Sequence, residues 1–363
     1  MNYLEYYGLQ QEPFSNAPVS KFFFNSAQHS KALLRLQYAA ESMKGLALLV
    51  GDIGAGKTTL ARRMLDQLPE DAYEAALLVI IHSGITAEWL LKRIATQLGV
   101  NEPAEDKLTL LSQLYKRLVE IHDSGKKAIV LIDEAQMLQT REIMEEFRGL
   151  LNLEVPGTKL LTFIFFGLPE LEENLKLDEP LAQRVALRYH LDPLSEEATS
   201  NYIEHRLRLA GRPAPLFAPD AVAAIHRFSR GIPRLINTIC DNGLFEGSLL
   251  KRESIEADII ENIAADLGLA QQESAAERAA RSAEAQQVMK DTARRAKEMA
   301  AGRGAPVASA PAQAPAAPAA AHVPTMSAPV SITPAPAPSA APAPKKEEAE
   351  DDEIDSILDQ FGE

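Results

Sequence analysis

The chain has 363 residues, a formal net charge of −14 and a single cysteine, Cys240. This length allows about two domains with buried cores, and the negative charge argues against broad, non-specific binding to nucleic acid or anionic lipid, although a local basic patch can exist. One cysteine excludes an intrachain disulfide, and neither a signal peptide nor ~20 uninterrupted apolar residues occur, so we expect a cytoplasmic protein without a membrane span.

Residues 1–25 are rich in aromatic side chains and show no helical or strand pattern. We expect an irregular segment there, which either covers the edge of a hydrophobic core or wraps the base of a bound nucleotide. Residues 26–44 then space their apolar side chains for burial on one helical face and end at Gly45, which predicts a helix.

The next stretch carries the clearest chemical signal of the chain. Apolar residues 46–50 predict a buried strand, a helical pattern ends at Pro69, and G-x-x-x-x-G-K-T lies between them. Such a loop presents backbone N–H groups to phosphate oxygens, while Lys57 supplies positive charge and Thr58 offers a hydroxyl to Mg²⁺. The sequence therefore predicts an ATP site made by Gly51, Asp52, Ile53, Gly54, Ala55, Gly56, Lys57, Thr58 and Thr59.

Strands and helices alternate along the chain as far as residue 191. Further strands are expected over residues 75–82, 128–132, 159–166 and 185–191, and helices over residues 86–98, 106–121 and 140–153. This alternation predicts an α/β fold with a parallel five-stranded sheet, helices on both faces and ligands at the carboxyl ends of the strands.

Asp133 and Glu134 directly follow the predicted strand over residues 128–132. Their strand ends at the same sheet edge as the phosphate-binding loop, so the two motifs together indicate a nucleotide hydrolase. Asp133 is expected to hold Mg²⁺ directly or through water, and Glu134 to orient and activate the water that attacks the γ-phosphorus. The predicted cofactors are therefore ATP and Mg²⁺.

From residue 193 onward the pattern contains only helices. Four helices are expected. The first lies between Ser195 and Gly211, the second between Pro219 and Gly231, the third between Pro233 and Gly247, and the fourth between Ile255 and Leu267. We therefore predict a nucleotide-binding domain over residues 1–192 and a small all-α lid over residues 193–267.

Three segments follow the predicted lid. Residues 268–300 favour a charged helix that is either solvated or fraying, and residues 301–344 form a Pro/Ala linker that we expect to be disordered. Residues 345–363 are acidic, with apolar residues at helical spacing. We interpret residues 353–361 as a peptide that docks into a partner protein; the alternative is a charged, solubilising tail.

Two arginines are candidates for contact with phosphate. Arg184 precedes the last predicted strand and could reach the γ-phosphate of a neighbouring subunit, whereas Arg234 begins a lid helix and could reach that of its own subunit. A surface salt bridge is the alternative role for each of them.

Residues 2–267 resemble the ExeA/GspA family of AAA+ ATPases from bacterial secretion systems. The motifs that carry the resemblance are, in chain order, Tyr6 to Leu9, Gly51 to Thr59, Leu131 to Gln136, Gly167 to Leu171, Gln183 to Leu191 and Gly231 to Asn237. The resemblance implies an AAA+ P-loop fold, with Arg184 as an arginine finger and Arg234 as a sensor-2 arginine. A finger that acts in trans implies a homo-oligomer, either a ring or a dimer.

The sequence departs from the family pattern in two respects. The family usually has Gln where this chain has Leu168, which cannot hydrogen-bond the attacking water, so either another polar residue substitutes or hydrolysis is slow. The family's membrane helix and peptidoglycan-binding domain are also missing, so we expect only indirect contact with the membrane. Residues 352–358 instead resemble the short acidic helices that bind CheY-type response regulators, which suggests such a partner.

These observations predict an Mg²⁺-dependent ATPase that oligomerises on ATP and assembles or remodels an envelope machine for secretion, pilus formation or polysaccharide export. It would be recruited to the inner face of the membrane. One alternative is an ATP-dependent DNA-binding regulator of the TniB/TnsC transposition type, against which the acidic balance counts. Another is a nucleotide-gated scaffold with little hydrolysis, which Leu168 would permit.

Overall fold

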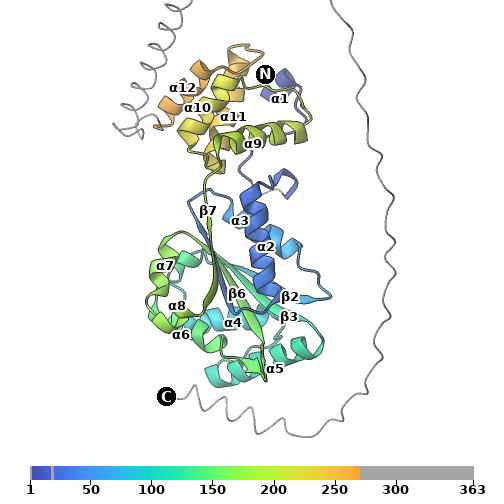
Figure 1. Cartoon of the computed structure of the whole chain (residues 1–363), viewed down its shortest axis with the longest axis vertical. Coiled ribbons are helices and arrows are strands. Elements are labelled where there is room, and N and C mark those ends of the chain that lie inside the picture. The colour runs from blue at the N-terminus through green and yellow to red at the C-terminus, as the bar shows by residue number, and fades with distance from the viewer. Residues whose placement is uncertain (1, 18–19, 270–363) are drawn as a thin grey trace, which may run out of the picture. The chain divides into compact units, whose positions relative to one another are not determined.

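The computed structural model describes residues 2–17 and 20–269, which form an α/β part followed by a helical part (Figure 1). Most of the predicted charged helix, the linker over residues 301–344 and the docking peptide lie outside the described residues and stay predictions. Within the described ranges, no helix is both long enough and apolar enough to cross a lipid bilayer.

Five parallel strands form the central sheet, in the order β2-β3-β6-β1-β7. The strands are Leu46–Gly51 (β1), Tyr73–Val79 (β2), Lys127–Asp133 (β3), Leu161–Gly167 (β6) and Val185–Leu191 (β7). All residues of β1 and β6 are buried, as expected for strands that are covered on both faces. The predicted parallel sheet is confirmed, and its carboxyl edge holds both the loop after β1 and Glu134 after β3.

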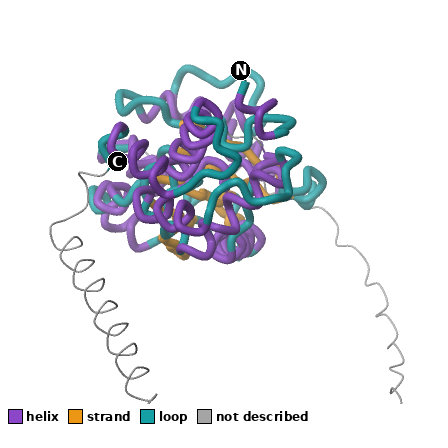
Figure 2. Tube along the Cα trace, turned by 90° about the horizontal axis from the view of Figure 1, so that it is seen from above, coloured by secondary structure: helices purple, strands orange, loops and turns teal. Residues whose placement is uncertain are grey.

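Helices enclose this sheet, as Figures 1 and 2 show. They are Ala27–Glu41 (α2), Lys57–Asp66 (α3), Ala87–Gln97 (α4), Lys107–Asp123 (α5), Arg141–Leu150 (α6), Glu170–Leu175 (α7) and Glu179–Gln183 (α8). One core cluster joins α2 and α3 to Leu49 and Phe166 of the sheet, and another joins α4, α5 and α6 to Leu48 and Phe165. Alternate residues of the same strands therefore serve opposite layers.

The helix starts follow from local capping chemistry. Five N-cap side chains each accept a hydrogen bond from the backbone amide three residues further on, and they belong to Ser26, Thr86, Asp106, Thr140 and Ser195. Each bond satisfies an amide that has no partner within the helix. The predicted starts of these helices are confirmed to within one residue.

One predicted strand begins later than expected. Residues 159–166 were the predicted strand, but Thr158–Lys159 (β5) pairs antiparallel with Glu154–Val155 (β4), and β6 starts only at Leu161. Gly157, at φ +81°, turns the chain between the two short strands. Because this conformation is costly for residues with a Cβ, glycine allows the hairpin that displaces the start of β6.

The helical part contains Glu196–Leu209 (α9), Pro219–Ser229 (α10), Pro233–Leu249 (α11) and Ala257–Asp266 (α12). The four predicted helices are confirmed, but the prediction that Gly247 closes the third is wrong, because α11 continues past it. A Cβ on Gly247 would lie 2.2 Å from Cδ1 of Ile255 and 2.5 Å from Oη of Tyr7. This glycine therefore permits close packing inside the helix and does not end it.

The N-terminal segment contains a helix that the sequence did not predict. Tyr3–Tyr7 (α1) is capped by the side chain of Asn2 and ends at Gly8, and Ser20–Phe22 (η1) forms a short 3₁₀-helix. The buried rings of Tyr7 and Phe14 belong to the same core cluster as α9–α12. The interpretation that this segment covers a core is confirmed for both rings, and the core is that of the helical part.

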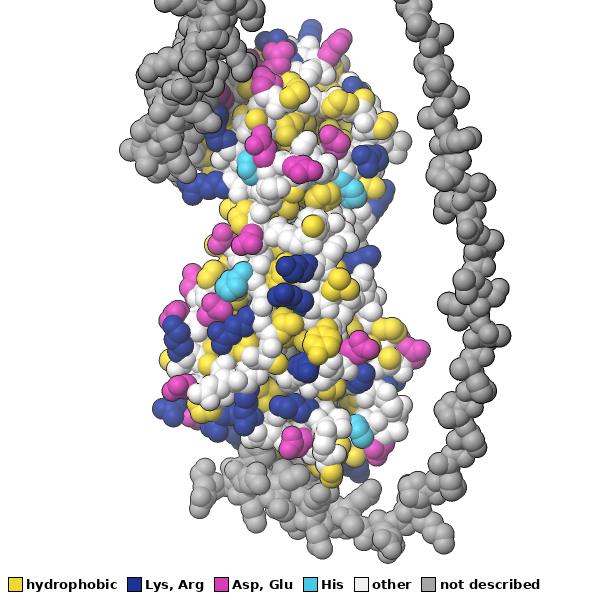
Figure 3. Space-filling model, viewed as in Figure 1, with side chains coloured by type: hydrophobic (Ala, Val, Ile, Leu, Met, Phe, Trp, Pro, Cys, Tyr) yellow, Lys and Arg dark blue, Asp and Glu magenta, His cyan; other side chains and the backbone are white. Residues whose placement is uncertain are grey.

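Basic side chains gather on one face of the otherwise acidic chain. In Figure 3, Lys and Arg side chains lie over α2, and Lys31 and Arg35 of this helix are exposed. The net charge of −14 therefore does not describe this surface locally.

Candidate nucleotide-binding site

The phosphate loop (residues 51–56) connects β1 to α3. Gly54 has φ +80° and Gly56 has φ +100°, and a Cβ on Gly54 would lie only 2.7 Å from Cβ of Arg234. Both the left-handed backbone and this close approach require glycine. The first N–H groups of α3 lack helical partners and carry the positive end of the helix dipole, which makes the loop suited to an anion.

Lys57 is buried beneath this loop. Its Nζ donates hydrogen bonds to the carbonyl oxygens of Gly51 and Asp52, both over 2.9 Å. Burial lowers the pKa of Lys57, and the nearby carboxylates of Glu134 and Asp133 oppose that shift. The ammonium group can exchange these two neutral acceptors for charged phosphate oxygens, which are stronger partners.

Asp133 ends β3 and is buried. Its Oδ1 accepts a hydrogen bond from the backbone N–H of Glu134 over 3.0 Å, whereas its Oδ2 is buried and makes no hydrogen bond to the described residues. Burial raises the pKa of Asp133, and hydrogen bonding from the Thr58 side chain and the Glu134 amide acts in the opposite direction. An unpartnered carboxylate oxygen beside a hydroxyl fits Mg²⁺, which takes few protein ligands and completes its shell with water and phosphate.

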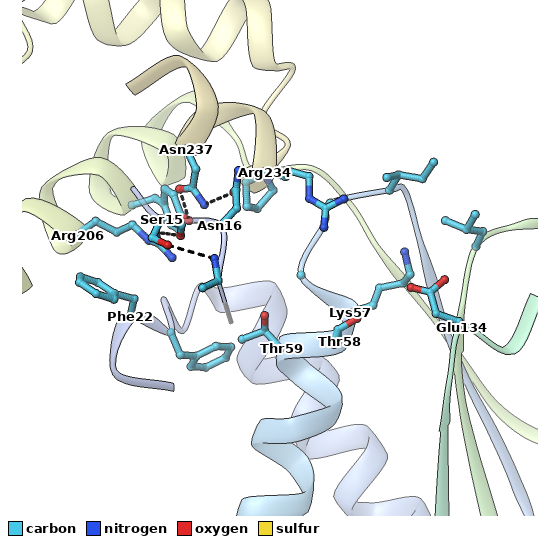
Figure 4. Close-up of a pocket in the computed structure, with 18 of the residues that line it drawn as sticks. Ser15, Asn16, Phe22, Lys57, Thr58, Thr59, Glu134, Arg206, Arg234 and Asn237 are labelled. Carbon is cyan, nitrogen blue, oxygen red and sulfur yellow. Dashed lines mark hydrogen bonds between the residues drawn. The ribbon is translucent and has the colours of Figure 1, made fainter. Parts of the chain in front are cut away.

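Glu134 has an unusual backbone for a residue with a side chain. Its φ and ψ are +56° and +35°, a left-handed conformation that costs on the order of 1–2 kcal/mol. The Glu134 carboxylate lines the cavity next to the phosphate loop and accepts a hydrogen bond from Nε2 of Gln136 over 2.6 Å. Figure 4 shows the side chains of Lys57 and Glu134 pointing toward each other.

The cavity itself has a volume of about 450 Å³, within the range of roughly 300–1,000 Å³ that is usual for small-molecule sites. Predicted site residues on its wall are Ile53, Gly54, Gly56, Lys57, Thr58, Thr59, Glu134 and Arg234. The carbonyl oxygens of Gly51 and Asp52 accept hydrogen bonds from the ammonium group of Lys57, and Ala55 is buried within the loop.

The two candidate arginines occupy different places. Arg234 lines the cavity from the first turn of α11, and its backbone N–H donates to the carbonyl of Gly54 over 3.3 Å. Arg184 is not among the residues that line the cavity. Its guanidinium donates to Oδ1 of Asn152 and, over 3.3 Å, to the carbonyl of Arg148. The structure thus brings only Arg234 to the loop of its own chain.

The other end of the cavity is built by residues that the sequence did not name as site residues, although Phe22 and Phe23 belong to the aromatic segment that we expected either to cover a core or to wrap the base of a nucleotide. Oη of Tyr202 donates to Oδ1 of Asn237 over 2.8 Å, and Nδ2 of Asn237 donates to Oδ1 of Asn16 over 3.0 Å (Figure 4). The rings of Phe22 and Phe23 also line this end. Of these residues only Asn237 lies in a recognised motif, because the contacts join segments that are distant in the sequence.

Arg206 fixes the N-terminal segment to α9. Its Nη1 donates to the carbonyl oxygens of Pro13 and Ser15 over 2.9 and 3.0 Å, and its guanidinium lies over the rings of Phe22 and Tyr202. Burial lowers the pKa of Arg206. This buried cation is held by carbonyls and aromatic faces, and it positions the wall of the cavity.

His29 supports the phosphate loop from α2. Its Nδ1 lies 2.6 Å from Oγ of Ser26, and a Cβ on Gly56 would lie 3.3 Å from its Nε2. Burial lowers the pKa of His29 to about 4, although a hydrogen bond with the backbone of Ala55 acts in the opposite direction. At neutral pH the ring is therefore uncharged and packs beneath the loop.

Comparison with known proteins identifies a matching family and a related protein. Residues 40–175 match the AAA domain family. General secretion pathway protein A of Aeromonas hydrophila is 40% identical to this chain over 245 residues, which cover 67% of this chain and 44% of that relative. The match therefore spans less than half the length of the relative.

Solved structures share the fold. The ORC2 protein of Aeropyrum pernix, determined in ADPNP–ADP complexes, is similar with a TM-score of 0.54 at 16% identity, covering 70% of this chain and 71% of that chain. Cdc6p from Pyrobaculum aerophilum gives a TM-score of 0.52 at 17% identity, with 67% of each chain covered. At such identities the likeness shows the fold alone.

Proposed function

This chain belongs to the AAA proteins related to General secretion pathway protein A, and on that premise we propose that it is an Mg²⁺-dependent ATPase. In this proposal it oligomerises on ATP and assembles or remodels an envelope machine, in the first place one for secretion. It works on the cytoplasmic side, where ATP is available, and reaches the inner face of the membrane through its partner.

The proposed mechanism assigns one role to the phosphate loop after β1 and another to the acidic residues at the end of β3. The loop amides and Lys57 bind the triphosphate, and the carboxylate of Glu134 accepts a proton from the attacking water. Thr58 and Asp133 would hold Mg²⁺, which would supply positive charge to offset the negative charge of the phosphates. Because the reacting groups lie in a partly enclosed cavity, their electrostatic effects are stronger than they would be in bulk water.

One observation supports this proposal above all others. Lys57, at the start of α3, and Glu134, directly after β3, line the same cavity with their side chains directed at each other (Figure 4). A phosphate-binding lysine and a water-activating carboxylate must face one triphosphate from two sides, and this arrangement supplies both.

The two arginines extend the proposal to an oligomer. Arg234 lies on the cavity wall and would contact the γ-phosphate of its own subunit. Arg184 lies outside the cavity and is half-buried, so we propose that it acts on the site of a neighbouring subunit. A homo-oligomer would then be required for full activity, because transition-state charge is stabilised only when the finger is in place.

Substitution of the proposed base tests the function. We expect Glu134→Gln to bind ATP with the parent affinity and to lose most hydrolysis, and Lys57→Ala to lose binding. Glu142→Gln, an exposed acid-to-amide change on α6, is the matched control and should hydrolyse ATP normally. Parent-level turnover in Glu134→Gln would rule out the assignment.

A second candidate function is a nucleotide-gated scaffold that hydrolyses ATP slowly. It is favoured by Leu168, which lines the cavity and offers no side-chain hydrogen bond at a position where the resembling family usually has Gln. Steady-state turnover with and without an envelope partner separates the two: a scaffold stays slow in both conditions.

A further inference from the structure

Gln136 lies beside the proposed base and is buried, in the short 3₁₀-helix Ala135–Met137 (η2). Both polar atoms of its side chain are occupied. Nε2 donates to Oε2 of Glu134 over 2.6 Å, and Oε1 accepts from the backbone N–H of Leu168 over 3.1 Å. The amide thus bridges the carboxylate after β3 to the residue after β6.

The orientation of this amide is fixed by its partners. A carboxylate can only accept and a backbone N–H can only donate, so a flipped amide would face each partner with the wrong atom. The backbone of Gln136 is anchored as well, since its carbonyl accepts from Nδ2 of Asn174 over 2.8 Å. A Cβ on Gly167 would lie 3.1 Å from Oε1 of Gln136, so the absence of a side chain there lets the amide reach the end of β6.

We propose that Gln136 is a positioning residue that fixes the carboxylate of Glu134 for catalysis and supplies, at the end of β6, the polar group that Leu168 lacks. The inference rests on the proposed ATPase function. A hydrogen bond to Oε2 restrains the carboxylate and leaves Oε1 to accept the proton of the attacking water. Leu168 takes part only through its backbone N–H, which any residue at that position other than proline would offer.

Two variants separate the parts of this bridge. Gln136→Glu keeps an acceptor for the N–H of Leu168 but replaces the donor to Glu134 with a second carboxylate, and Gln136→Met removes both bonds at similar volume. We expect kcat to fall roughly 10-fold or more in each variant, because a general base contributes about 10²- to 10⁴-fold only when it is correctly placed. In Gln136→Met the Kd for ATP should stay close to that of the parent, because this change adds no charge to the cavity that Gln136 lines.

A rescue experiment tests the compensation for Leu168. Leu168→Gln in the Gln136→Met background restores a side-chain amide at the end of β6, and we expect it to recover a measurable part of the lost kcat. A purely structural role for Gln136 would not predict recovery from a second site. No recovery in the double variant would overturn the compensation between the two positions.

Glu134→Gln, measured in parallel, separates the two proposals. If Glu134→Gln is inactive and Gln136→Glu keeps parent kcat, the positioning role is wrong and the ATPase function stands. If Glu134→Gln keeps parent turnover, the proposed base fails and the role of Gln136 fails with it. A loss of ATP binding in Gln136→Met that equals its loss of kcat would also overturn the positioning role.

Discussion

The backbone N–H of Arg234 donates a hydrogen bond to the carbonyl of Gly54 over 3.3 Å, so the first turn of α11 rests directly on the phosphate loop. The helical part and the phosphate loop are therefore in direct backbone contact through Arg234 and Gly54. A change in the loop conformation on nucleotide binding would therefore act on α11 through the backbone itself.

Gly54→Ala should weaken ATP binding by roughly 5- to 150-fold. The new Cβ would lie 2.7 Å from Cβ of Arg234, at a backbone of φ +80°, and strain of about 1–3 kcal/mol corresponds to a loss of affinity in that range. Titration with a fluorescent ATP analogue measures the Kd. Gly125→Ala is the control, because Gly125 has φ +78° but no atom within 4 Å of the added methyl. Equal Kd values for both variants would contradict the role of the contact.

Arg184→Ala should bind ATP normally and hydrolyse it poorly, since we propose that this residue acts on a neighbouring subunit. Mixing this variant with Glu134→Gln should restore part of the activity. In mixed oligomers the intact Glu134 of one variant is paired with the intact Arg184 of the other. Turnover across a series of mixing ratios checks this. A strictly additive response at all ratios argues that the arginine does not work in trans.

Arg206→Met should lower the free energy of unfolding by about 2 kcal/mol, because it leaves a buried carbonyl, that of Pro13, and a partly buried one, that of Ser15, without their charged donor. The segment that contains Pro13 and Ser15 should loosen, and ATP affinity should fall with it. Urea unfolding and nucleotide titration measure the two effects. Arg208→Ala, an exposed change on the same helix, should alter neither quantity. Unchanged stability of Arg206→Met would show that other contacts hold the segment.

Gly247→Ala should destabilise the helical part by about 1–3 kcal/mol through overpacking. The added methyl would lie 2.2 Å from Cδ1 of Ile255. Ile255→Val removes that atom, at a cost of about 0.5–1.5 kcal/mol by itself. The double variant should therefore be more stable than the sum of the single changes predicts, and a double-mutant cycle of unfolding free energies measures the difference. Simple additivity would mean that the strain lies elsewhere, for example at Tyr7.

His29 should make stability depend on pH below about 6.5. Burial lowers its pKa from 6.5 to about 4, so between these values the unfolded chain binds a proton that the folded chain does not. Stability is fully present above pH 6.5 and declines as the pH falls toward 4, by about 3 kcal/mol in all. His29→Gln should decline less over this window, whereas His122→Gln, a change at an exposed position, should follow the parent. Parallel curves for His29→Gln and the parent would exclude this contribution.

Much of the fold could be predicted because its signals are local. A strand such as β1 is marked by a short apolar run, a helix start by a residue such as Thr86 that can cap it, and the phosphate loop by glycines at fixed spacing before Lys57. Parallel strands align their carboxyl ends, so the chain order alone also placed Glu134 at the same sheet edge as the loop. These properties depend on residues that are close in the sequence or on general rules of topology.

Only the tertiary structure decided which distant segments meet. It placed Tyr7 and Phe14 in the core of the helical part, brought Arg206 to the carbonyls of Pro13 and Ser15, and set the amide of Gln136 between Glu134 and Leu168. The tertiary structure also places Gly247 inside α11, whereas the sequence predicts that this glycine ends the helix. Such contacts leave no periodic trace, because the free energy of a packed or hydrogen-bonded pair depends on where both partners lie in space and not on their spacing along the chain.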